Sequence, residues 1–240
     1  MIGDMLTVMW KERKGLFVSR GSRLRAMLNL LVPVGLVAIW FPIVEGPDWV
    51  SSPIALTALM IPMLLVSTTI PDSFAGERER HTLSTLLASC LPDKAVLFGK
   101  LAVAVGYGWL VTIVAILLAL VTVNAAHWQG HVLLYSPAIV VADVVLSFLL
   151  AVFVAGAGIL ISLRSASVQS AQQLLVTILL VPPVILGVIF TAFYKQIGNA
   201  LGGVTFMDAV LIAMGVIIAA DAVLLLVTMA RFQRARLILG

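Results

Sequence analysis

The residues best suited to chemistry or to binding a partner lie in one charged segment, residues 72–94, of an otherwise apolar chain. Glu77, Arg78, Glu79 and Arg80 alternate in charge within it. If the segment is helical, its apolar residues form one continuous face at spacings of i, i+3, i+4, i+7 and i+8: Leu83, Leu86, Leu87, Cys90 and Leu91. Acidic groups at the start of a helix also complement its dipole. The pattern predicts an amphipathic helix with a leucine face against the protein and a charged first turn open to water or to a partner.

Two carboxylates are predicted to lie inside the membrane, where charge is costly. Asp143 and Asp221 each interrupt a long apolar run that contains no basic partner. Such residues are by default functional candidates. They could line a translocation path, bind a cationic substrate group or, as neutral acids, join helices by hydrogen bonds. Pro182 and Pro183 in another apolar run predict a kink, which is either a packing feature or a hinge.

The motifs of the chain do not indicate an enzyme. H-E-x-x-H and G-x-S-x-G are absent. His127 and His131 have too few companions for a metal site, and the single Cys90 excludes a cysteine cluster. Gly99 and Lys100 lack the earlier glycine and the following Ser or Thr of a P-loop. We therefore expect no catalytic residues, no metal and no cofactor in this chain.

The composition calls for an integral membrane protein. Of the 240 residues, 62% are hydrophobic and 11% charged, against about 25% charged in an average soluble domain. Apolar runs long enough to cross a bilayer as helices cover residues 26–43, 53–70, 101–123, 137–163, 170–193 and 206–230. Barrel strands would alternate between apolar and polar residues, and these runs do not. The predicted fold class is an all-α membrane protein with six transmembrane helices.

The basic residues sort to one side of these predicted spans. With the N-terminus inside the cell, all of the 15 basic residues except Lys195 fall in cytoplasmic segments. The outer loop at residues 44–52 carries Glu45 and Asp48 instead. The positive-inside rule therefore predicts that both termini and residues 72–98 are cytoplasmic. Because the net charge of +4 follows this sorting, nucleic acid is not an expected partner.

The first 25 residues are predicted to form a helix along the inner membrane surface. Apolar residues recur there at helical spacing, and the basic residues fall largely on other faces, toward lipid headgroups. The apolar residues are Leu6, Met9, Trp10, Leu16 and Phe17. The helix either only anchors the first span or also touches a partner. No repeat, long linker or signal peptide is indicated, so residues 1–240 are predicted to form a single transmembrane domain.

The residues around the charged segment resemble one family of membrane proteins. The run Ala75-Gly-Glu-Arg-Glu-Arg-His-Thr-Leu83, then Leu86-Leu87-Ala-Ser, then Gly99-Lys100, is similar to the loop after the second span of ABC-2 type export permeases. These are the transmembrane subunits of ATP-binding-cassette exporters. Six spans, inside termini and an N-terminal interfacial helix resemble the family over the whole chain. The family often has glycine where His81 stands, proline where Cys90 stands and an acidic residue where Ser84 stands.

The resemblance implies that residues 72–98 carry a coupling helix, which docks on a separate cytosolic ATPase subunit. The residues carried over to this interface are Glu77, Arg78, Glu79, Thr82, Leu83, Leu86 and Leu87. ATP and Mg²⁺ would then be bound by that partner, and a second permease copy, identical or similar, would complete the path. The implied function is outward transport by alternating access in the plasma membrane, most simply of a prokaryote.

Two other functions are compatible with the same sequence. A secondary transporter driven by an ion gradient would use Asp143 or Asp221 for coupling. Its activity would survive ATP depletion and collapse with the proton gradient. A membrane scaffold would transport nothing and would co-purify with no ATPase.

Overall fold

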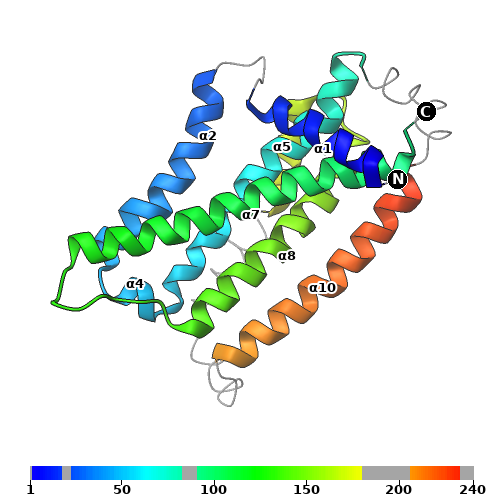
Figure 1. The fold of residues 1–240 in the computed structure, drawn as a ribbon. Helices are drawn as coiled ribbons and strands as arrows, with labels where there is room; N and C mark the ends of the chain where they lie inside the picture. Colours follow the sequence, from blue (N-terminus) through cyan, green and yellow to red (C-terminus); the bar gives the residue numbers. More distant parts are fainter. Residues whose placement is uncertain (1, 18–22, 83–90, 180–205, 233–240) are drawn as a thin grey trace.

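The computed structural model of the chain describes residues 2–17, 23–82, 91–179 and 206–232. Within these ranges all regular structure is helical, and there is no strand. Long helices pack side by side, and the N-terminal helix α1 (Ile2–Phe17) lies across α7 at one end of the bundle (Figure 1). The all-α fold class is confirmed for the described residues.

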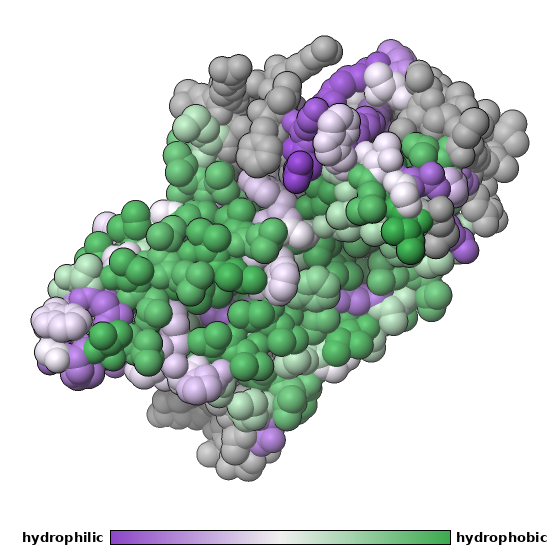
Figure 2. Space-filling model, viewed as in Figure 1, coloured by the Kyte–Doolittle hydropathy of each residue, from purple (hydrophilic) through white to green (hydrophobic). Residues whose placement is uncertain are grey.

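Four helices in the described residues are long and apolar enough to cross a membrane. The first joins the 3₁₀ helix η2 (Pro53–Leu59) to α5 (Met60–Glu79), and the others are α7 (Asp93–Ala126), α8 (Pro137–Ser162) and α10 (Phe206–Arg231). All four coincide with predicted spans. Figure 2 shows hydrophobic side chains over the middle of the molecule and hydrophilic ones toward its ends. The chain therefore has the make-up of a multi-pass membrane protein.

The predicted span at residues 26–43 is helical but changes its geometry along its length. α2 (Arg23–Gly35) passes into a π-helical turn, η1 (Leu36–Trp40), and then into α3 (Phe41–Glu45). Pro33 lies inside α2 and cannot donate a backbone hydrogen bond, which weakens the α-helical ladder just before the π turn. The apolar part of this stretch is shorter than the four long helices.

The predicted span at residues 170–193 is only partly described. Residues 168–179 are helical. The predicted kink at Pro182 and Pro183 lies outside the described residues. The number of six spans therefore stays a prediction.

α7 and α8 each pack closely on α5 at a glycine. Gly108 of α7 and Gly158 of α8 both lie against α5, since a Cβ at these positions would come within 2.8 Å of Val66 and 2.9 Å of Ile70, respectively. Small residues let membrane helices pack backbone against side chain in this way. α10 packs mainly on α8, and the short helix α4 (Asp48–Ser51) lies near the ends of η2 and α3. α5 therefore packs on both α7 and α8, which also contact each other, and its last turn is close to several elements at once.

Candidate functional site

The charged segment begins as the last turn of α5. Glu77, Arg78 and Glu79 continue this long helix without a break. The prediction that they form the first turn of a separate helix was therefore wrong. Acidic residues favour a helix start, but here the hydrogen bonds of the preceding apolar helix simply continue through them.

A Schellman motif then ends α5. The His81 N–H donates to the Arg78 carbonyl at 3.0 Å, and the Thr82 N–H donates to the Glu77 carbonyl at 2.9 Å. His81 has a φ of +56°, the left-handed conformation that this motif requires one residue past the helix. Glycine adopts this conformation at the lowest cost, and histidine occupies it here.

Residues 79–82, which are the last residue of α5 and the three that follow it, form an exposed tip. Arg80 Nη2 lies 2.6 Å from Asp72 Oδ1 in an ion pair whose two side chains are about half exposed. Thr82 Oγ1 donates to the Glu77 carbonyl at 3.2 Å. The predicted leucine face, with Leu83, Leu86 and Leu87, lies outside the described residues and stays a prediction.

Three helices meet in a mostly buried group of polar residues that we call the charge cluster. Its members are Lys11 and Glu12 of α1, Ser73 and Glu77 of α5, and Lys100 of α7. The Lys100 side chain is 1% exposed, and its Nζ lies 3.0 Å from Glu12 Oε1 and 3.0 Å from Glu77 Oε1. It also donates to the Ser73 carbonyl at 2.7 Å. Lys11 Nζ donates to the same Glu77 oxygen at 2.8 Å.

The charge cluster is electrically balanced, with two ammonium groups facing two carboxylates. Buried charges are tolerated when they are paired and hydrogen-bonded, and the loss of one partner from such a pair costs about 3–5 kcal/mol. Partial burial alone would lower the pKa of Lys11. The hydrogen bond and the charge of Glu77, helped by Glu12, outweigh burial and raise the Lys11 pKa above its usual value. The charge cluster therefore joins α1 electrostatically to the bundle.

Apolar contact joins the same elements. A Cβ at Gly99 of α7 would lie 2.8 Å from Val8 Cγ1 of α1, so only glycine permits this approach. Val8 is buried, whereas Leu6 and Trp10 of the predicted apolar face are exposed, with Lys14 Nζ 3.7 Å from the Trp10 ring centroid. α1 thus has an inner face on α7 and a separate outer face of exposed apolar side chains.

Arg78 and Glu79 form hydrogen bonds with the segment that follows α8. The Arg78 guanidinium donates to the carbonyls of Leu163 and Ser165, at 3.0 Å each. Glu79 Oε1 accepts a hydrogen bond of 2.8 Å from the Val168 N–H, where the helical residues 168–179 begin. A cation at helix carbonyls and a carboxylate at helix amides both complement the helix dipole. Three consecutive charged residues of α5 therefore bind three different parts of the bundle.

The sequence patterns missed the charge cluster itself. Lys100 was predicted as a cytoplasmic basic residue and as part of the family resemblance, not as a buried ion-pair partner, and Glu12 was not a candidate site residue. The available signal was that both residues are charged and adjoin apolar faces: Lys100 directly precedes an apolar run, and Glu12 interrupts a basic helix. Their meeting across 88 positions depends on how α1 packs, which no local pattern contains.

Asp143 is buried among side chains whose donors are already used. Its side chain is 1% exposed, and its Oδ1 has no hydrogen-bond partner. Trp109 Nε1 donates to the Val144 carbonyl at 2.9 Å, one residue further along α8. The Tyr135 hydroxyl accepts from Trp49 Nε1 at 2.8 Å. Burial, with a smaller contribution from the Asp143 charge and against that hydrogen bond, raises the pKa of Tyr135 to about 12.

Asp221 lies on the face of α10 that packs on α8. It is 6% exposed, and neither of its carboxylate oxygens has a hydrogen-bond partner. Val210 and Leu224 share this face at helical spacing; Val210 packs with Ala142 of α8, and Leu224 lies against Gly156. This register places Asp221 roughly 15 Å further along the bundle than Asp143. The two carboxylates therefore do not form one site.

The described residues do not indicate a metal site. They contain no group of three or more His, Cys, Asp or Glu side chains placed to hold a metal ion. Comparisons with protein-family models, with curated proteins and with solved structures gave no match. The functional conclusions therefore rest on the chain's own residues and their geometry.

Proposed function

We propose that this chain is the permease subunit of an ABC-2 type exporter, which moves a substrate outward by alternating access. A separate cytosolic ATPase would bind ATP and Mg²⁺, so the chain would not be an enzyme by itself. It would have six spans with both termini inside, would lie in the plasma membrane of a prokaryote, and would pair with a second permease copy.

The exposed tip at residues 79–82 is the observation that carries this proposal. A cytosolic motor must push on the membrane helices through a small and rigid contact. The tip is rigidly connected, because Glu77 binds α1 and α7 while Arg78 binds the end of α8. Groups that are packed and paired move together. Glu79, Arg80 and Thr82 would then meet the ATPase, and Glu77 and Arg78 would transmit its movement.

The proposal is tested by co-expression with a P-loop ATPase encoded beside this chain. Arg80→Glu should reduce ATPase co-purification and ATP-dependent transport at least tenfold, because it reverses the charge of an exposed tip residue. Arg164→Glu is the matched control, since Arg164 is exposed near the end of α8 and outside the tip. Unchanged binding and transport in the double variant Glu79→Lys/Arg80→Glu, with folding intact, would contradict the docking role.

A secondary transporter driven by an ion gradient is the second candidate. It is favoured by the two buried carboxylates without partners, Asp143 and Asp221. Transport that continues after ATP depletion and stops when the proton gradient is collapsed would replace the first proposal by this one.

A further inference from the structure

We propose that the seam between α8 and α10 binds an amphiphilic organic cation, with its apolar part in a pocket at one end of the seam and its charged nitrogen at Asp221. That this ligand is the exported substrate rests on the function proposed above, whereas its binding does not.

The seam contains an apolar pocket of about 360 Å³. Its walls come from the first turns of α8, including Ala138 and Val141, and from the first turns of α10, including Val210 and Met214. Ligand pockets in proteins start at roughly 300 Å³. The volume is therefore sufficient for a short alkyl or aryl group.

Asp221 supplies the charge on the same seam. It is seven residues after Met214, two turns along the same face of α10, which is roughly 10 Å at 1.5 Å per residue. Both carboxylate oxygens are buried and have no donor. A buried carboxylate in an apolar setting is costly unless it finds an opposite charge or a proton.

The surroundings determine which ligand class fits. An alkylated ammonium group offers a positive charge without needing hydrogen-bond acceptors, and the side chains that line the pocket are all apolar. An anionic amphiphile would be repelled by the carboxylate. The most apolar stretch of α10 is only 11% buried, against 33–44% in the other three long helices, so α10 has the most exposed surface of the four.

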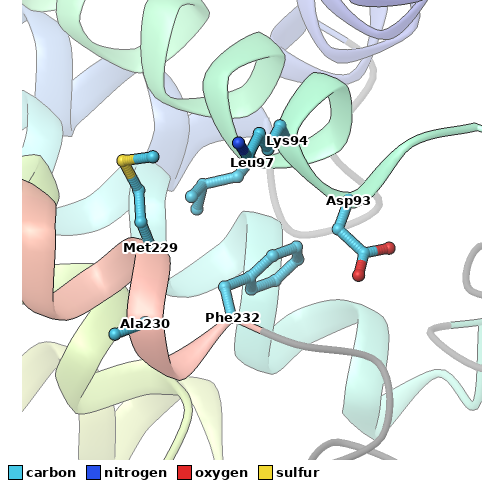
Figure 3. A pocket seen from close by; sticks show the side chains of 6 residues that line it. All are labelled: Asp93, Lys94, Leu97, Met229, Ala230 and Phe232. Carbon is cyan, nitrogen blue, oxygen red and sulfur yellow. The ribbon is translucent and has the colours of Figure 1, made fainter.

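A second pocket does not select a ligand in the same way. It has a volume of about 290 Å³ and lies between the start of α7 and the end of α10, among Leu97, Met229 and Phe232 (Figure 3). Both Asp93 and Lys94 border it. Because opposite charges lie at its edge, its electrostatics favour neither cations nor anions.

The test uses the full-length chain in lipid nanodiscs and octyltrimethylammonium as the probe, with empty nanodiscs of the same lipid as background. We expect saturable binding to the wild-type chain and at least tenfold weaker binding to Asp221→Asn. Asp48→Asn, which removes an exposed carboxylate that does not line the pocket, should bind like the wild type. Octyl sulfate should show no binding beyond background. Equal affinity of wild type and Asp221→Asn, no binding to the wild type, or equal binding of octyl sulfate would each overturn the proposal.

A second variant keeps the test decisive if Asp221→Asn does not fold. Val210→Trp fills the pocket and leaves the carboxylate in place. It should weaken octyltrimethylammonium at least fivefold, and an unchanged affinity would overturn the proposal. No ATPase or ATP is present in these measurements. A failure here therefore leaves the exporter proposal intact, and a failure of ATPase co-purification leaves the binding result intact.

Discussion

In the charge cluster every charged group has an opposite charge within 3.6 Å, whereas the buried carboxylates Asp143 and Asp221 have none. Both regions contain carboxylates on long apolar helices. They differ in what the neighbouring helices supply. α7 brings Lys100 to Glu77, but Asp143 Oδ1 has no donor, and Trp109 and Tyr135 donate to backbone carbonyls instead.

Burial alone does not distinguish a charge that stabilises the fold from a charge that can bind a ligand, whereas the presence or absence of a partner does. A buried charge that is paired with opposite charges stabilises one arrangement of helices, and any change of that arrangement must break several ion pairs together. A buried carboxylate without a partner stabilises nothing until a proton or a cation arrives. The charge cluster therefore acts as a structural joint, and Asp221 is the carboxylate at which we propose that a cation binds.

The largest expected effect comes from breaking the charge cluster at its centre. Lys100→Met leaves Glu12 and Glu77 buried without their shared ammonium, and should lower the free energy of unfolding by about 3–5 kcal/mol. The measurement is unfolding in mixed detergent micelles. Lys94→Met is the control, because Lys94 is exposed and should tolerate the change. A loss of under about 1 kcal/mol would show that the cluster is not a joint.

The same chemical change at the two regions gives the sharpest comparison. Glu77→Gln removes a charge that pairs with two lysines, and should cost about 1.5–3 kcal/mol in the free energy of unfolding. Asp143→Asn removes a carboxylate without a partner at Oδ1, and should cost less than about 1 kcal/mol or stabilise the protein. Equal losses of unfolding free energy in the two variants would show that the paired and the unpaired carboxylate contribute alike to stability.

A smaller effect is expected at the turn that carries Glu77. His81→Gly should raise the free energy of unfolding by about 0.5–1 kcal/mol, because glycine adopts positive φ without the steric cost that histidine has. Arg80→Gly is the matched control one residue earlier, where φ is −84° and glycine brings no such relief. The two variants are compared by their unfolding midpoints, and a gain in Arg80→Gly with a loss in His81→Gly would contradict the turn geometry.

The smallest effect concerns pH. The Lys11 pKa is raised in the folded protein, so its contribution to stability is complete below the unfolded value of about 10.4 and is lost as pH rises through the folded value. Because the Lys11 side chain is about half exposed, the loss should stay below about 1 kcal/mol. Unfolding midpoints between pH 8 and 11 should fall less steeply for Lys11→Met than for the wild type. Identical slopes would show that Lys11 does not contribute.

Much of the architecture could be predicted because it depends on local composition. The apolar runs that became α8 and α10 were identified nearly to their ends, since a helix must satisfy its own backbone inside a membrane, whereas α7 begins at Asp93, well before the predicted run at residues 101–123. The end of α5 was misjudged, because acidic residues that suit a helix start also occur in a last turn when other helices supply their partners. The π turn after Pro33 was not foreseen, since proline signals a disturbance but not its form.

The sequence by itself determined that this chain is helical, that it belongs in a membrane and that its charges gather in a few short stretches. Hydropathy and charge are properties of single residues and short windows, so they need no knowledge of neighbours. Only the tertiary structure decided which charges have partners. Lys100 meets Glu12 because α1 packs across α7 at Gly99, and Asp221 meets no cation because the face of α8 opposite it is apolar. The pairing of charges depends on which helices pack together and in what register. These contacts join segments that are distant in the chain, so no short window of sequence predicts them.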